Sequence, residues 1–168
     1  MISLLGPVGS PLPWVRGAGK RLLLIAHQAA PTPLLFLAQR AVEVAAEVVL
    51  VLLGPASEYP FTGVPPAVEV LQSEPDGTWN DATNVLSWAD QLFVVADEAL
   101  WPEAFSQVYH QIQQQRSTVP VNFVFGVFDL PFPCGTGACL ACMVRCKTTN
   151  RLACKEGPAL DLTEVLLA

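Results

Sequence analysis

The chain has 168 residues, a formal net charge of −6 at pH 7, 52% hydrophobic residues and only 14% charged ones. A chain of this length forms one domain that buries a core without disulfides, and an acidic chain with scattered lysines and arginines is not typical of nucleic-acid binding. The mean hydropathy of +0.42 is high, but apolar runs such as residues 48–53 are far shorter than the ~20 residues of a membrane-spanning helix.

Strands and helices alternate along the first 126 residues. Short apolar, β-branched runs predict strands that are covered on both faces, as in a parallel sheet. Thr32-Pro33 marks the first helix start, because these residue types favour a helix N-terminus. In chain order we expect a strand at 21–26, a helix at 34–46, strands at 48–53 and 67–71, a helix at 80–88 with a polar cap, a strand at 91–96, a helix at 101–116 and a strand at 121–125. The expected fold is α/β, an open, mostly parallel sheet of about five strands.

The character of the sequence changes after residue 126, where glycine, proline and cysteine dominate. Residues 143–147 and 152–155 are expected to form a hairpin across residues 148–150, and residues 161–167 a final helical turn. We therefore divide the chain into an α/β domain, residues 1–126, and a small cysteine-rich segment, residues 127–168.

All five cysteines lie within this segment. Cys134, Cys139 and Cys142 have the spacing C-x4-C-x2-C, and Cys154 follows after 11 intervening residues. This spacing with a distant fourth cysteine is that of plant-type 2Fe–2S proteins. Three ligands on one tight loop can wrap a small inorganic core while the fourth reaches it from another element. Cys146 is interpreted as a small buried residue, with the role of fourth ligand as the alternative.

Two glycines support the iron–sulfur interpretation. Gly135 and Gly137 permit positive φ, and they let backbone N–H groups approach the sulfur atoms and stabilise the charge of a reduced cluster. A structural zinc site with four cysteines is the competing hypothesis. Zinc ribbons use two C-x2-C-type pairs, whereas this sequence has one, and so the spacing favours iron and sulfur.

The N-terminal sequence MISLLGPVGSPLP has neither the basic start nor the long apolar stretch of a secretory signal. Clustered thiols without such a signal predict a reducing compartment, where they bind metal more often than they form disulfides. We expect a cytoplasmic protein.

The segment PCGTGACLACMVRCKTTNRLACKEGPALDLTEV, residues 133–165, resembles the C-terminus of the electron-transfer subunit of dihydroorotate dehydrogenase. That family shows a C-G-x-G-A-C-x-x-C run, a hairpin, and a C-x-x-G-P-x-x-D-x-x-E-V ending. In this chain the positions are Cys134, Gly135, Gly137, Ala138, Cys139 and Cys142, and then Cys154, Gly157, Pro158, Asp161, Glu164 and Val165. The resemblance is looser over the preceding α/β region.

The resemblance implies a ferredoxin-reductase-like flavoprotein of pyrimidine biosynthesis. A full member has a flavin-binding β-barrel, a nucleotide-binding α/β domain and a 2Fe–2S loop, and passes electrons between NAD, FAD, the cluster and the flavin of a catalytic subunit. By this resemblance residues 1–126 are a nucleotide-binding-like domain and residues 127–168 bind the cluster.

The chain departs from the family in two places. Residues 4–13, LLGPVGSPLP, resemble the family's exit from its barrel, so we expect no flavin barrel, and no FAD unless a partner domain supplies its site. The G-G-x-G-x-A-P turn of the family is replaced by AHQAAPT at residues 26–32. Side chains of His27 and Gln28 would crowd a pyrophosphate at the helix N-terminus, which argues against NAD binding.

The sequence thus predicts an electron-transfer subunit with no catalytic residues of its own. We expect a protein redox partner, with a flavoprotein subunit as one candidate, within a hetero- or homo-oligomer. The partner is expected to be neither nucleic acid nor membrane. The alternatives are a reductase component that uses NAD(P)H or a flavin, and a structural zinc domain.

Overall fold

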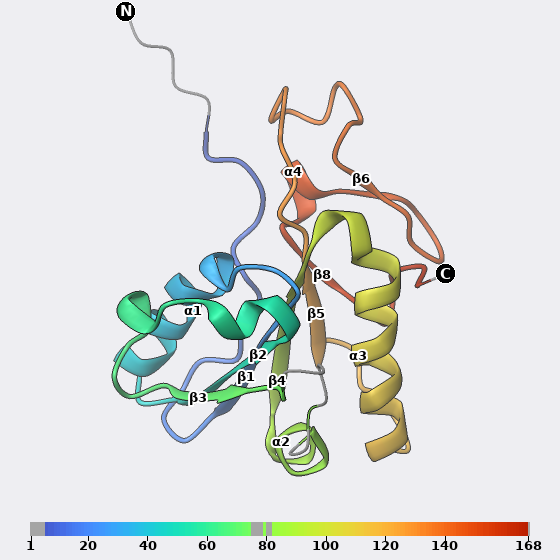
Figure 1. Cartoon of the computed structure of the whole chain (residues 1–168). Helices are drawn as coiled ribbons and strands as arrows, with labels where there is room; N and C mark the ends of the chain where they lie inside the picture. The colour runs from blue at the N-terminus through green and yellow to red at the C-terminus, as the bar shows by residue number, and fades with distance from the viewer. Residues whose placement is uncertain (1–5, 75–78, 80–81, 168) are drawn as a thin grey trace, which may run out of the picture.

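The structure, a computed structural model, describes residues 6–74, 79 and 82–167. In this part of the chain, six strands form one sheet (Figure 1). In spatial order they are β3 (Glu69–Gln72), β2 (Glu47–Leu53), β1 (Arg21–His27), β4 (Gln91–Ala96), β5 (Val124–Val127) and β8 (Ala159–Asp161). The first five are parallel, and β8 is antiparallel to β5 at the edge.

Helices cover both faces of this sheet, as Figure 1 shows for α1 and α3. The helices are α1 (Thr32–Glu43), α2 (Ala82–Trp88), α3 (Trp101–Gln115) and α4 (Ala153–Glu156), with 3-10 turns η1 (Gly54–Glu58), η2 (Phe61–Gly63) and η3 (Glu98–Leu100). Successive side chains of a strand point to opposite faces. In β1, Leu23 and Ile25 therefore pack in the core beneath α2 and α3, while Leu22 and Leu24 pack beneath α1. Burial on both faces explains why these strands are apolar throughout.

The expected α/β fold is confirmed, with shifts at the ends of elements. The first helix ends at Glu43 rather than residue 46, because Ala45 adopts a positive φ of 57°. The fifth strand begins at Val124 rather than residue 121, after Asn122 at φ 63°. Pro31, not Thr32, precedes the first helical residue of α1. The polar cap expected at residues 80 and 81 lies outside the described residues.

The tail after the cysteines differs most from expectation. The hairpin is short, with β6 (Met143–Val144) paired to β7 (Arg151–Leu152), and α4 follows directly. The predicted helical turn from residue 161 is present as a single turn after Asp161, in which the N–H groups of Glu164 and Val165 both donate to the carbonyl oxygen of Asp161, at 3.0 and 3.3 Å. Asp161 ends strand β8, and its carboxylate accepts the backbone N–H groups of Asn122 at 2.6 Å and Thr163 at 2.8 Å. These bonds hold the chain in a tight turn at the edge of the sheet.

The N-terminal chain is fixed to the sheet by a buried amide. Gln91 is 1% exposed at the start of β4. Its Nε2 donates to the carbonyl oxygens of Pro13 and Asn122, both at 3.0 Å, and its Oε1 accepts the N–H of Val15 at 2.8 Å. A buried polar side chain with every group bonded costs little and fixes the route of the chain.

Among the helices that the structure describes, none is both long enough and apolar enough to cross a membrane.

Candidate metal centre

The cysteine loop, residues 134–142, extends from the end of the molecule that also carries α4 and β6 (Figure 1). Its backbone takes conformations that favour glycine, with φ of 60° at Gly135 and 80° at Gly137. Both glycines thus adopt the positive φ expected of them. Leu140 also has a positive φ, 59°, and its side chain is 55% exposed.

The four cysteines of the predicted ligand set make contacts in two pairs. The backbone N–H of Cys139 donates to Sγ of Cys134 at 3.5 Å. The backbone N–H of Cys154 donates to Sγ of Cys142 at 3.4 Å. The first pair lies within the loop, while the second joins the end of the loop to α4. All four are free thiols.

The two pairs differ in their surroundings. Cys142 and Cys154 are 1% and 2% exposed and pack against Ala153 in a small apolar cluster. Cys134 is half-buried and Cys139 is exposed. One side of the centre therefore faces the protein interior, and the other faces solvent.

Backbone hydrogen bonds make one of these thiols acidic. The N–H groups of Cys139 and Thr136 lower the pKa of Cys134 to about 5, so its thiolate predominates at neutral pH. The thiolate is the form that binds metals. The pKa of Cys154 is raised by its hydrogen bond with Cys142 and by burial, against the backbone N–H of Gly137, which lowers it.

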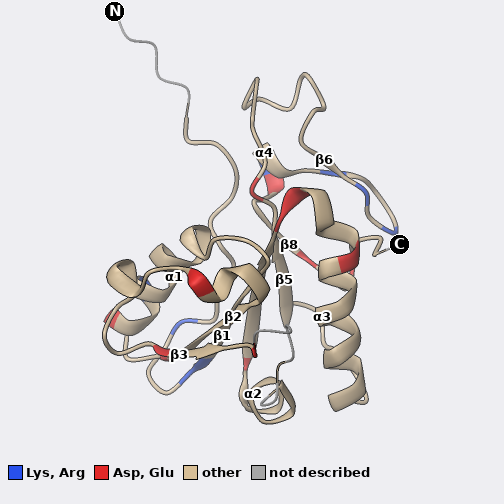
Figure 2. Ribbon diagram, in the orientation of Figure 1, with Lys and Arg blue, Asp and Glu red and all other residues tan. Residues whose placement is uncertain are grey.

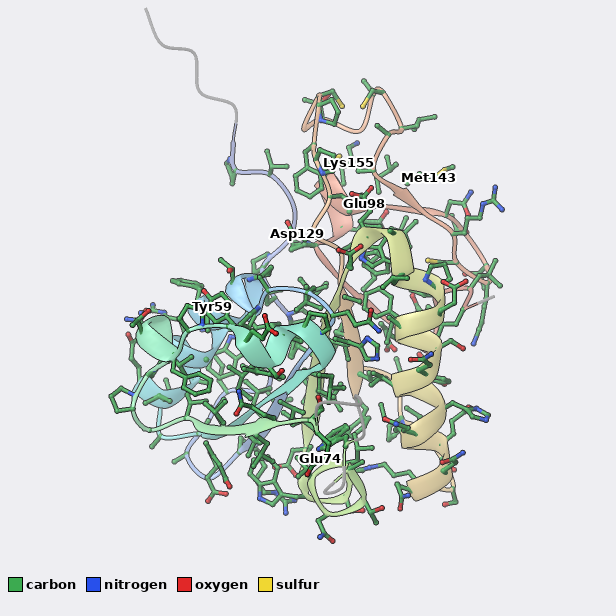
Figure 3. The ribbon with its side chains drawn as sticks, in the orientation of Figure 1. Tyr59, Glu74, Glu98, Asp129, Met143 and Lys155 are labelled. Carbon is green, nitrogen blue, oxygen red and sulfur yellow. The ribbon has the colours of Figure 1, made fainter. Side chains whose placement is uncertain are left out.

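Lys155 lies across the loop at Gly137. A Cβ built on Gly137 would stand 2.8 Å from Cε of Lys155 and 3.1 Å from Cδ1 of Leu152. The alkyl stem of Lys155 thus occupies the space that a side chain at position 137 would need. Figure 3 shows Lys155 at the end of the molecule that carries the cysteine loop.

The fifth cysteine belongs to a different cluster. Cys146 is 7% exposed and packs in the core beneath α2 and α3, where its residue forms an antiparallel bridge with Val165. Burial raises the pKa of its thiol. Cys146 is thus the small buried residue that the sequence predicts.

Across the described ranges, no three His, Cys, Asp or Glu side chains are grouped as a site for a single metal ion. Backbone N–H groups are directed at two of the four sulfur atoms, and Cys134 also acts electrostatically on Cys154. Soft thiolate ligands select zinc, copper(I) or iron–sulfur clusters. The donor set therefore fits the group that the sequence predicts.

The turn after β1 lies at the carboxyl end of the sheet, where nucleotides bind in open α/β folds. Nδ1 of His27 is buried and has no hydrogen-bond partner among the described residues, and burial lowers the pKa of this imidazole. Gln28 follows with φ at 57°. Pro31 precedes α1 and Pro33 lies in its first turn, and a proline has no N–H to offer a phosphate.

Sequence reasoning missed the contacts of the N-terminal segment with α4. Gly9 and Ser10 bond to backbone groups at residues 154–157. The only sequence signal for them is the G-P-x-G run at residues 6–9.

The C-terminal segment matches a known family. Residues 132–166 match the family model described as the iron–sulfur cluster binding domain of dihydroorotate dehydrogenase B. No curated protein matches the chain. The matched range contains all four cysteines of the two pairs as well as Cys146.

A solved structure shares the fold of the whole chain. It is reported under the description "Insights into flavin-based electron bifurcation via the NADH-dependent reduced ferredoxin-NADP oxidoreductase structure". Its chain superposes with a TM-score of 0.70 at 17% identity, over 98% of this chain and 59% of that one. This chain thus spans 59% of the length of that neighbour. The family match supports an electron-transfer role, and the C-terminal segment is similar to the iron–sulfur cluster binding domain of dihydroorotate dehydrogenase B, carried on a ferredoxin-reductase-like α/β fold.

Proposed function

We propose that this chain is an electron-transfer protein that carries one 2Fe–2S cluster on Cys134, Cys139, Cys142 and Cys154. The observation that carries the proposal is the pairing of these cysteines within a segment similar to an iron–sulfur cluster binding domain. When bound, such a cluster supplies one-electron redox chemistry.

A 2Fe–2S cluster and a zinc ion would use the four cysteines differently. In a 2Fe–2S cluster each iron takes two protein ligands, whereas a structural zinc ion gathers four around one point. Cys134 and Cys139 would hold one iron, and Cys142 and Cys154 the other. Gly135 and Gly137 would let the backbone close around the cluster.

The protein would position the cluster and shield one side of it from solvent. The buried pair would anchor the cluster against the apolar cluster around Ala153, and the outer pair with Cys139 would face a redox partner. We propose that this partner is an oxidoreductase, with a flavoprotein subunit as the first candidate, and that the complex works in the cytoplasm in pyrimidine biosynthesis. No side chain of this chain is assigned a catalytic role. Residues 1–126 would then serve as scaffold and docking surface, and residues 127–168 as the cluster-binding segment.

Anaerobic reconstitution with iron and sulfide tests the proposal. We expect about two iron and two sulfide per chain, a visible absorption spectrum, and an EPR signal after reduction. Cys154→Ala should lose the cluster because it removes one ligand, and Cys146→Ala, the matched control in the same segment, should keep it. Colourless protein with one equivalent of zinc would contradict the proposal, as would loss of the cluster in the Cys146 variant alone.

A further inference from the structure

The N-terminal strap, residues 6–12, contacts the turn that carries Cys154. In Figure 1 this blue segment approaches α4. The N–H of Gly9 donates to the carbonyl oxygen of Cys154 at 2.8 Å, and the N–H of Ser10 donates to that of Gly157 at 2.6 Å. Oγ of Ser10 donates to the carbonyl oxygen of Lys155 at 2.9 Å. The strap and α4 are separated by more than 140 residues of sequence, since the last of these bonds spans 145.

These hydrogen bonds provide partners for backbone carbonyl groups that a short helix cannot pair internally. The last four carbonyl groups of any helix have no partner within it, and α4 has only four residues, Ala153–Glu156. The N–H of Gly157 donates to the carbonyl oxygen of Ala153 at 3.1 Å. Groups of the strap donate to the carbonyl oxygens of Cys154 and Lys155, so two of the four carbonyls of α4 have their partners in the strap.

Packing at this contact is tight at Gly9, and Gly157 is tightly packed against Ala153 within the same turn. A Cβ built on Gly9 would stand 2.6 Å from the carbonyl oxygen of Gly157 and 3.6 Å from that of Ala153. A Cβ on Gly157 would stand 2.9 Å from Cα of Ala153. Val8, the residue before Gly9, packs against the apolar cluster that contains Cys142 and Cys154. A side chain at position 9 would therefore collide with the backbone at Gly157.

We propose that Gly9 and Ser10 are positioning residues for Cys154, which hold α4 so that this thiol stays beside Cys142. The proposal rests on the proposed function for its purpose, because a fourth ligand on a four-residue helix needs support from outside that helix. It does not need the metal for its geometry, since the contacts join protein atoms alone.

Two substitutions in the full chain test the strap. Gly9→Ala places a methyl group against the carbonyl oxygen of Gly157, and Ser10→Ala removes one hydrogen bond without adding bulk. Gly19→Ala is the matched control, because Gly19 also has a positive φ, 68° against 80° for Gly9, yet nothing lies within 4 Å of its Cβ position. Both glycine variants therefore carry the same kind of backbone strain, and they differ in contact with α4.

The first readout is the rate at which iodoacetamide labels Cys154 in the metal-free protein, measured by mass spectrometry with Cys146 as internal reference. The quantity compared is the labelling rate of Cys154 divided by that of Cys146. We expect this ratio to rise about tenfold in Gly9→Ala and about threefold in Ser10→Ala, because local opening exposes a thiol that is otherwise buried. Gly19→Ala should match the wild type. The proposal is overturned if the ratio for Gly9→Ala and Ser10→Ala equals that of Gly19→Ala, or if labelling of Cys146 rises in parallel, which would mean general destabilisation. Ser10→Ala decides alone if Gly9→Ala does not fold.

The second readout is the rate of cluster loss to a chelator after reconstitution. It should rise about tenfold in Gly9→Ala, within the range seen when groups that orient metal ligands are removed. If the wild type takes up no cluster, the proposed function fails, while the labelling ratio still decides the role of the strap.

Discussion

At the scale of single residues, one cation is placed to influence the centre. Lys155 follows a proposed ligand directly, and its stem crosses the cysteine loop at Gly137. Two other basic side chains of the segment are engaged elsewhere: Nζ of Lys147 donates to the carbonyl oxygen of Thr163 at 2.7 Å, and Arg151 bonds to Glu156 and Glu164. Lys155 is therefore the lysine of this segment that the structure places against the loop.

We expect Lys155→Met to lower the reduction potential of the reconstituted cluster, because a nearby positive charge stabilises the more negative, reduced form. The shift should be on the order of 50 mV, less than a tenfold change in the equilibrium constant of a one-electron couple. A redox titration followed by absorption or EPR measures it. Lys155→Arg keeps the charge and should stay near the wild-type potential. Equal potentials in the Met and wild-type proteins would show that the ammonium group has no electrostatic effect on the cluster.

At the scale of elements, one arginine holds the end of a short helix. The guanidinium of Arg116 donates to the carbonyl oxygens of Leu86 at 3.0 Å, Ser87 at 3.2 Å and Ala89 at 2.7 Å. It also lies 4.2 Å from the ring centroid of Phe123, and burial lowers its pKa. Two carbonyl groups of the last turn of α2 and that of Ala89, just after the helix, thus share one planar donor.

Arg116→Lys should reduce the free energy of unfolding by about 1–2 kcal/mol, because an ammonium group cannot reproduce this fork of hydrogen bonds. Urea denaturation followed by circular dichroism measures the change. Arg40→Lys is the matched control, since Arg40 forms an exposed pair with Glu43 one turn away at 2.6 Å, and such pairs contribute little. Similar losses in the two variants would contradict the capping role of Arg116.

At the scale of the whole molecule, the balance of basic and acidic residues differs between the two parts of the chain. Residues 132–168 carry four basic and three acidic side chains, whereas residues 1–131 carry five and twelve. In Figure 2 the ribbon that follows β6 is blue at the positions of its lysine and arginine residues. Charges of opposite sign on two surfaces steer encounter and orientation more than they add affinity. An acidic surface on the redox partner would therefore favour approach from the side of the cysteine loop.

The turn between β1 and α1 lies where nucleotides bind in open α/β folds. NADH added to the reconstituted protein should leave the cluster spectrum unchanged unless a flavoprotein is also present. The reason is that His27 and Gln28 stand where a glycine-rich turn would admit a pyrophosphate, and two prolines remove N–H donors near the start of α1. Dithionite should bleach the same sample and so confirm that the cluster is reducible. Bleaching by NADH alone would instead identify a reductase component.

Much of this arrangement follows from local sequence. The apolar runs predict the parallel strands because each strand is covered on both faces, while the four-cysteine ligand set stays a prediction from the spacing. Strand β8 was not predicted, since Ala159–Asp161 is too short to show a period and pairs with β5 only through the tertiary fold. The contact of Gly9 with Gly157 is equally hidden, because nothing in either local sequence specifies a partner so far along the chain.

The return of the chain to β8 has a consequence for the cysteine loop. Val127 and Ala159 are register partners on adjacent antiparallel strands, so residues 128–158 leave the sheet and re-enter it at the same point. A short turn between these two residues would close the same strands as a simple hairpin. Residues 128–158 are thus an excursion whose two ends already meet, so the length of the cysteine loop can vary without re-routing a strand of the sheet.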